Sequence, residues 1–183
     1  MNPAPDPADV QHQVHQWLCQ TLGQQADAAF IYGSVAAGMA TPASDIDCVI
    51  FTTRNLGHGH QSRIRADFAT LQQRLGYTPD LSYPIETFTV DQCQRSLASR
   101  ETLLQVLALS APGAENNFLQ SDDAEILRAL LGRRLTVRPS PHLDDLTLRA
   151  DTFAAAIGNQ TAWLHLLGVK HPRPLLHARI EGP

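Results

Sequence analysis

Two short stretches of the sequence carry residue types that can bind a metal ion and a phosphate group. Asp45 and Asp47 are two residues apart, so in an extended segment their carboxylates project from the same face. Two such carboxylates repel each other unless a cation lies between them, and Mg²⁺ is commonly held by one or two carboxylates plus substrate phosphates. Gly33 lets a phosphate approach the backbone closely, and Ser34 offers a hydroxyl and an N–H. Together these stretches predict a site for a metal ion and a nucleoside triphosphate.

The elements predicted around these residues are a strand, a glycine turn and a second strand within residues 28–52. The first strand is the apolar run Ala28–Tyr32, which Gly33 and Ser34 end abruptly. The second strand is predicted to carry both aspartates, and its near-continuous apolar run indicates that both of its faces are covered. Its apolar residues are Ile46, Val49, Ile50 and Phe51.

This pattern resembles the signature of the DNA polymerase β-like nucleotidyltransferase superfamily. Tyr32-Gly33-Ser34, ten intervening residues and then Asp45-Ile46-Asp47-Cys48 match the signature at its usual spacing. The resemblance covers roughly the first half of the chain, and the small members include aminoglycoside nucleotidyltransferases and the minimal nucleotidyltransferases of toxin–antitoxin pairs. One departure concerns Ala37, which stands where many small members have an arginine. The triphosphate is therefore one cation short, or another part of the chain supplies it.

The resemblance implies a fold and a reaction. The fold is an α/β (α+β) polymerase β-like core with a mixed sheet and flanking helices, followed by a C-terminal helical part. The reaction transfers a nucleoside monophosphate, by default AMP from ATP, to an acceptor hydroxyl and releases pyrophosphate. Two Mg²⁺ ions are expected as cofactors, with Asp45 and Asp47 as their bridging ligands and with Gly33 and Ser34 holding the β- and γ-phosphates.

The resemblance also implies a third carboxylate on a later strand. Asp80 is the first candidate, as a metal ligand or as the base toward the acceptor, because it opens a strand predicted from the alternating pattern of residues 80–89. Glu86 is the alternative on the same face, and Pro84 argues that this strand is an edge strand or contains a bulge. Asp80 as a simple turn residue also remains open.

Cations that could meet the triphosphate are few. Lys170 is the only lysine, and Arg133-Arg134 is the only adjacent basic pair. Lys170 is our first candidate for nucleotide binding, with Arg133 and Arg134 as alternatives, although ordinary solvation of long charged side chains explains all three equally well.

The remaining sequence predicts a two-part organisation. Residues 8–98 form the catalytic core, 99–170 a helical substrate-side part, and 171–183 a proline-containing tail. Helices are expected over residues 8–24, 61–75 and 90–97 and as one or two helices over 143–167, while 133–141 is expected to be a connection that contains prolines.

Composition restricts the function classes. The net charge is −4, and no basic cluster suited to a polynucleotide backbone is present, so a polynucleotide substrate is not expected. Cys19, Cys48 and Cys93 show neither zinc-site nor disulfide spacing, and Cys48 is expected to be a small buried hydrophobe. Neither a signal peptide nor an apolar stretch of the ~20 residues that span a bilayer is evident, so we expect a cytoplasmic protein.

Three functions stay open at this point. The first is a nucleotidyltransferase that acts on a small-molecule acceptor. The second is a protein-AMPylating enzyme of toxin–antitoxin type, which would need a protein partner. The third is a degenerate nucleotide-binding or interaction module, which the alanine at position 37 favours and the intact Gly-Ser and Asp pairs disfavour.

Overall fold

A mixed four-stranded sheet forms the centre of the protein. The computed structural model describes residues 5–82, 84–95, 129–156 and 169–173. The strands lie in the order β3-β2-β1-β4. β1 is antiparallel to both of its neighbours, whereas β2 and β3 are parallel, which confirms the predicted mixed sheet. The strands are β1 (Ala26–Ile31), β2 (Cys48–Thr52), β3 (Glu86–Thr89) and β4 (Leu135–Arg138).

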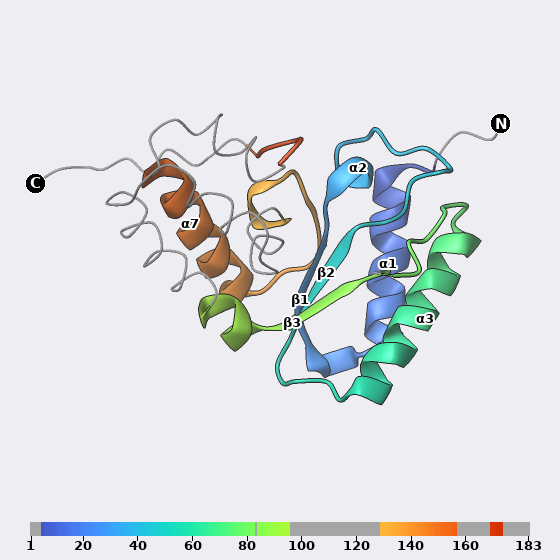
Figure 1. Ribbon diagram of the computed structural model, residues 1–183, viewed down its shortest axis with the longest axis horizontal. Coiled ribbons are helices and arrows are strands. Elements are labelled where there is room, and N and C mark those ends of the chain that lie inside the picture. The colour runs from blue at the N-terminus through green and yellow to red at the C-terminus, as the bar shows by residue number, and fades with distance from the viewer. Residues whose placement is uncertain (1–4, 83, 96–128, 157–168, 174–183) are drawn as a thin grey trace, which may run out of the picture.

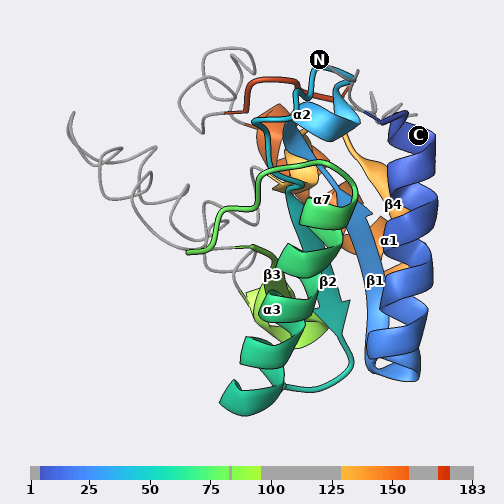
Figure 2. The same ribbon diagram turned by 90° about the vertical axis from the view of Figure 1, so that its right-hand side faces the viewer.

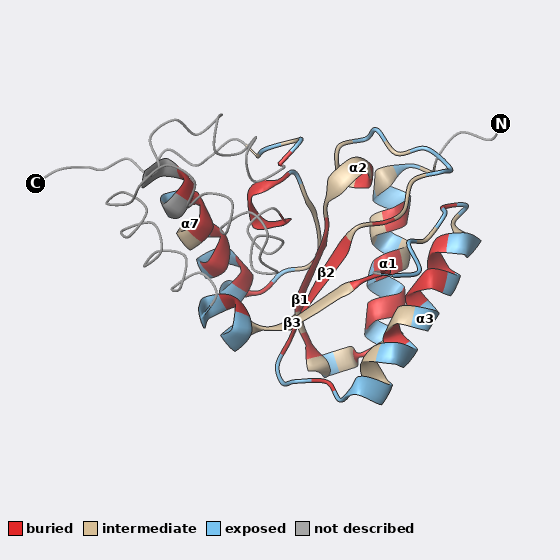
Figure 3. Cartoon of the chain, viewed as in Figure 1, coloured by how far each residue is buried: buried red, intermediate tan, exposed pale blue. Residues whose placement is uncertain are grey.

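Helices cover both faces of this sheet (Figure 1). Helices α1 (Pro7–Thr21) and α3 (His58–Arg74) lie on one face, and α7 (Pro141–Ala156) lies on the other. The sheet therefore has two cores, and alternate residues of β1 and β2 enter each of them. Every residue of β2 is buried, as predicted for a strand with both faces covered, and Figure 3 shows the buried sides of the helices turned toward the sheet.

Local sequence signals set the ends of several elements. Asp6 accepts a hydrogen bond from the Ala8 N–H at 2.9 Å and caps α1. Gly76 ends α3 with a φ of +84°, a left-handed conformation that favours glycine. Thr89 and Gln92 exchange side-chain-to-backbone hydrogen bonds at 2.7 and 3.1 Å, a capping box that begins the predicted helix after β3. The rest of that helix beyond residue 95 lies outside the described residues.

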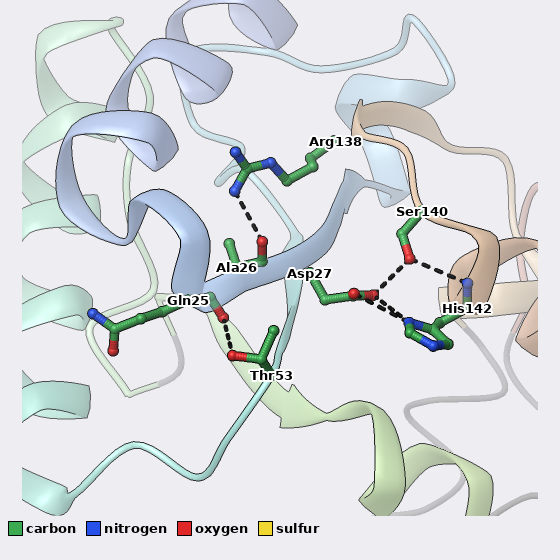
Figure 4. A network of polar contacts seen from close by, with 7 residues as sticks. All are labelled: Gln25, Ala26, Asp27, Thr53, Arg138, Ser140 and His142. Atoms are coloured by element: carbon green, nitrogen blue, oxygen red, sulfur yellow. Dashed lines mark hydrogen bonds and ion pairs between the residues drawn. The ribbon is translucent and has the colours of Figure 1, made fainter.

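Strand β4 corrects one prediction. The sequence predicts a connection over residues 133–141, but residues 135–138 pair with β1 instead. Helix α1 supports the outer edge of this strand, since the His15 imidazole donates to the Val137 carbonyl at 2.8 Å. The Arg138 guanidinium donates to the Ala26 carbonyl at 2.9 Å (Figure 4). The predicted division into a core and a helical part stays a prediction, because residues 96–128 lie outside the described ranges.

Asp27 attaches α7 to the first strand (Figure 4). The Ser140 hydroxyl donates to Asp27 at 2.6 Å, and the His142 ring nitrogen Nδ1 lies 3.1 Å from the same carboxylate. Ser140 also accepts the backbone N–H of His142 at 3.1 Å, so Ser140 is the N-cap of the helix. Because the serine hydroxyl donates to the aspartate and not to the imidazole, this cluster is a helix cap and not a nucleophile–base pair.

Two cysteines belong to the hydrophobic cores. Cys48 and Cys93 are both buried, which confirms the prediction for Cys48. Burial, and to a smaller extent the charge of Asp47, raises the pKa of the Cys48 thiol, and burial raises the pKa of Cys93 to about 12. Neither thiol is therefore an activated nucleophile. None of the helices in the described ranges combines the length and the apolar character required to span a membrane.

Candidate functional site

The glycine turn and the aspartate pair meet at the end of β1. Gly33 has a φ of +66°, and a Cβ atom at this position would lie 1.9 Å from Oδ2 of Asp47. The Tyr32 N–H donates to the Asp47 carbonyl at 3.0 Å. Both the backbone conformation and the contact with the carboxylate thus require a residue without a side chain. Ser34 follows in the short helix α2 (Gly33–Ala36), at the edge of the sheet where β2 begins (Figure 2).

The aspartates precede β2, although the sequence placed them within the strand. β2 begins at Cys48, because the Ile46 N–H donates to the side chain of Gln72 at 2.7 Å and not to a neighbouring strand. Ile46 is buried, whereas Asp45 and Asp47 on either side of it are half-exposed. This alternation of partly exposed and buried residues is typical of an extended segment, and the metal-binding role of the two aspartates stays a prediction.

Strand register places Glu86 on the same face as Asp47. Asp47 alternates with Val49 and Phe51, whose side chains pack in the core beneath α7. Glu86 pairs with Val49 in the parallel β2–β3 ladder, and paired residues on adjacent strands project from the same face. Phe88, two residues later, packs against the same core. Glu86 therefore lies on the strand next to the segment of Asp47, on the same face and two residues farther along.

Asp80 does not open a strand, which corrects the premise for choosing it. The strand predicted over residues 80–89 begins only at Glu86. Asp80 is exposed in a preceding loop, where its Oδ1 accepts the Ser82 N–H at 2.8 Å. Such a local side-chain hydrogen bond favours a turn over a strand. Across the described parts of the chain, no group of three His, Cys, Asp or Glu side chains is placed to hold a metal ion. The metal role of Asp80 stays a prediction.

Gln72 joins the two carboxylate-bearing segments, and the sequence analysis did not identify it. Its side chain is fully buried. The amide oxygen accepts the N–H of Ile46, between the two aspartates, and the amide nitrogen donates to the Pro84 carbonyl at 3.0 Å. One side chain of α3 therefore satisfies a buried backbone donor before β2 and a buried backbone acceptor before β3.

Helical spacing carried a signal for this glutamine. Gln72 lies four residues after Phe68 and eight after Ile64, so it continues the apolar stripe of α3. A polar residue on such a stripe is buried, and a buried amide needs hydrogen-bond partners. The partners themselves could not be named from the sequence, because they are backbone groups of distant loops.

The candidate cations differ in their surroundings. Lys170 and Arg133 are exposed. Arg134 is half-buried, with its guanidinium carbon 5.5 Å from the centre of the Phe30 ring and one nitrogen donating to the Thr147 hydroxyl at 2.6 Å. Burial and, to a smaller extent, the charge of Arg173 together lower the pKa of Arg134 to about 10, although two carboxylates of α7 oppose the shift.

Comparison with known proteins finds a family profile that matches the part of the chain containing this site. The family profile described as "Nucleotidyltransferase domain" matches residues 17–103, a range that contains the glycine turn, both aspartates and Glu86. This match confirms the predicted resemblance and the predicted fold class. A comparison with curated proteins finds no match.

One solved structure resembles the chain. It is described as "Crystal structure of the toxin-antitoxin with AMP-PNP", and it is 11% identical over 85% of this chain and 92% of that chain, with a TM-score of 0.43. At this level of similarity the likeness carries no argument about what the present chain binds.

A first prediction concerns Gly33. Gly33→Ala should lower the free energy of unfolding by about 2–5 kcal/mol, since it adds a left-handed alanine and displaces the Asp47 carboxylate. Gly38→Ala is a matched control, because Gly38 has a similar φ of +70° but no atom within 4 Å of an added Cβ. The control should cost only about 1–2 kcal/mol. Equal losses in chemical denaturation would show that the close approach of Asp47 imposes no constraint.

A second prediction concerns Gln72. Gln72→Leu should lower the free energy of unfolding by about 2–4 kcal/mol, because one buried N–H and one buried carbonyl lose their partner. Gln73→Leu, at the exposed neighbouring position, should change it by no more than about 0.5 kcal/mol. Urea denaturation of both variants measures the difference. If the two variants were equally stable, Gln72 would not be what joins the two segments.

Proposed function

We propose that this chain, whose residues 17–103 belong to the nucleotidyltransferase domain family, transfers a nucleoside monophosphate to a hydroxyl group of a small-molecule acceptor. ATP is the proposed donor by analogy within the family, an associational argument. The observation that supports the proposal most is the contact between the Gly33 backbone and the Asp47 carboxylate. It brings the proposed phosphate-binding turn and the proposed metal-binding carboxylate together where β1 ends and β2 begins.

The residues present fit a magnesium site that the substrate completes. Asp45 and Asp47 offer carboxylate oxygens, the ligand type that Mg²⁺ prefers, and both remain half-exposed. Since no group of three His, Cys, Asp or Glu side chains lies together among the described residues, a pair of carboxylates completed by water and substrate phosphates suits Mg²⁺ better than zinc. Bound there, Mg²⁺ would supply charge stabilisation for the attacking and leaving oxygens of an in-line displacement.

The chain's own residues have distinct proposed roles in this reaction. Gly33 and Ser34 bind the β- and γ-phosphates through backbone N–H groups and the Ser34 hydroxyl, which makes no hydrogen bond to any described residue. The acceptor oxygen forms a bond to the α-phosphorus, and the bond from that phosphorus to the oxygen shared with the β-phosphate breaks. Pyrophosphate leaves with that oxygen, and the acceptor hydroxyl proton passes to a carboxylate base.

Glu86 is the carboxylate that we propose for this base or for a third metal ligand. It begins β3, shares a face with Asp47, and is half-buried, whereas Asp80 is exposed and engaged in its own turn. Gln72 couples the segment before Glu86 to the segment between Asp45 and Asp47. A shift of one carboxylate relative to the others is thereby restricted, which is what preorganised catalysis requires.

A small-molecule acceptor agrees with the charge of the chain. The net charge is −4, and a polynucleotide acceptor would call for a basic surface along its backbone. A protein acceptor is the outcome to be distinguished by experiment, because a labelled nucleotide would then appear on a polypeptide and not on a small molecule.

The third prediction tests the nucleotide site itself. Thermal unfolding of the wild type should shift upward with one nucleoside triphosphate only when Mg²⁺ is present, since binding to the native state stabilises it. Asp45→Asn and Asp47→Asn should each abolish this shift and lower nucleotide transfer by at least about 100-fold, because the carboxylates are proposed to hold the ion. Asp67→Asn, at an exposed position of α3, serves as the control and should retain both.

Two outcomes would count against the proposal. Transfer that survives in either aspartate variant would show that the pair does not hold a catalytic ion. The lack of a shift in the wild type with ATP, GTP, CTP and UTP would instead favour a degenerate module that no longer performs the chemistry.

The fourth prediction separates the two candidate third carboxylates. Glu86→Gln should lower the rate of transfer by about 10²–10⁴-fold, the range for loss of a general base, with little effect on nucleotide affinity. Asp80→Asn should lower it by less than about threefold, as expected for an exposed turn residue. The reverse ranking in single-turnover kinetics would restore Asp80 as the functional carboxylate.

A further inference from the structure

Among the described residues, no carboxylate contacts the half-buried guanidinium of Arg134. Its hydrogen bond to that part of the chain runs to the neutral hydroxyl of Thr147 at 2.6 Å, and its carbon stacks 5.5 Å from the Phe30 ring centre. Two carboxylates of α7, Asp144 and the buried Asp151, act on Arg134 electrostatically, and Asp151 accepts a hydrogen bond from Arg173 at 2.6 Å. Arg134 and Arg173 thus share one buried acid, and among the described contacts only Arg173 is hydrogen-bonded to it. Because burying an unpaired charge is costly, an anionic ligand is the natural partner.

Strand register places this charge on the face that holds the catalytic candidates. Leu135 of β4 pairs with Ile31 of β1, so Arg134 lies beside Tyr32. The other edge of β1 places Tyr32 beside Asp47, where the Tyr32 N–H donates to the Asp47 carbonyl. Asp47, Tyr32 and Arg134 therefore form one row across three neighbouring strands, with the backbones of the first and last separated by roughly 10 Å, twice the strand spacing.

The side chains of this row share one face of the sheet. Tyr32 packs against the core beneath α7, and Arg134 covers Phe30, which belongs to that same core. Asp47 is on this face by its alternation with Val49 and Phe51. The Arg134 side chain is only half-buried, and a guanidinium has five N–H groups, of which the contact with Thr147 uses one.

Arg134 could also replace an arginine that this chain lacks in the turn after Gly33. Position 37, where many small relatives have an arginine, is Ala37, whose backbone N–H donates to the Gly33 carbonyl at 3.1 Å. On the described residues, α2 contributes no cation to the site. A cation for the phosphates has to come from another element, and Arg134, just before β4, lies beside Tyr32 on the side away from Asp47.

We propose that Arg134 binds the β- and γ-phosphates of the nucleotide, in place of the arginine that is absent at position 37. This inference rests on the proposed function, because it assumes that a nucleoside triphosphate occupies the site between Gly33 and Asp47. Arg134 is favoured over its neighbour Arg133 and over Lys170, both of which are exposed and fully solvated. A stacked, preorganised guanidinium also binds phosphate oxygens with two parallel hydrogen bonds, which an ammonium group cannot do.

The fifth prediction compares the affinities for ATP and AMP in the presence of Mg²⁺. Arg134→Gln should weaken ATP binding by roughly 10- to 100-fold, the range for losing a charge-assisted hydrogen bond, while AMP binding changes by less than about threefold. The ratio of the AMP dissociation constant to the ATP dissociation constant should therefore fall, by about 10- to 100-fold where AMP binding is unchanged. Arg134→Lys should recover part of the ratio because it restores the charge without the fork of donors.

Arg133→Gln and Lys170→Gln are the matched controls, since each removes one positive charge from an exposed position. Both should leave the ratio of the AMP dissociation constant to the ATP dissociation constant within about twofold of the wild-type value. Thermal unfolding of each variant monitors folding, and a variant that merely loosens the structure would weaken both nucleotides together and leave the ratio unchanged.

Each outcome decides one point. An unchanged ratio in Arg134→Gln, or a fall of the ratio in Lys170→Gln instead, would overturn the assignment while the nucleotide site stands. Wild-type protein that binds neither nucleotide would overturn the proposed function and this inference with it. A fall of the ratio restricted to Arg134→Gln, with partial recovery in Arg134→Lys, would support the inference.

Discussion

The close approach of the Asp47 carboxylate to the Gly33 backbone is the contact on which the rest of the site depends. It fixes the path of the chain at the end of β1, because only a residue with a left-handed conformation and without a side chain fits there. From this point the short helix α2 begins, and the segment of Asp45 and Asp47 must run beside it. The two motifs are also held together by the backbone, since the Tyr32 N–H donates a hydrogen bond to the Asp47 carbonyl. Ten residues separate the two motifs in sequence, yet they form a single structural unit.

Much of this unit could be predicted from the sequence, because its determinants are local. The apolar runs before Gly33 and after Asp47 indicate buried strands, and the regular stripe of α3 indicates its inward face. Predictions were wrong where tertiary contacts override local preference. Arg133 and Pro139 suggested a connection, yet β4 forms because β1 has an unpaired edge and α1 covers the new strand from outside. The alternating pattern after Asp80 suggested a strand, but Pro84 and the turn at Ser82 delay it until Glu86.

Charge is distributed unequally between the two faces of the sheet. The core beneath α1 and α3 is built from apolar and aromatic side chains, with Gln72 hydrogen-bonded through both its amide oxygen and its amide nitrogen. The core beneath α7 contains Asp151, Arg173 and Arg134, and burial raises the pKa of Asp151 in spite of the opposing charge of Arg173. The first face therefore provides a rigid support, in which the polar atoms of Gln72 are satisfied internally. The second face holds ionisable groups whose pKa values burial shifts, a property that is common at functional sites.

The return of the chain to β1 has a consequence for how the molecule forms. Ile31 and Leu135 are direct partners in the sheet although about a hundred residues separate them, so this pairing is among the contacts of highest sequence separation. Such contacts close large loops and form late in folding. During synthesis from the ribosome, the apolar edge of β1 stays open until β4 emerges, and an open apolar edge is prone to intermolecular pairing. A fragment that ends with the matched family region at residue 103 would keep that edge open permanently. The sheet is thus completed by a strand that lies outside the segment that matches the nucleotidyltransferase profile.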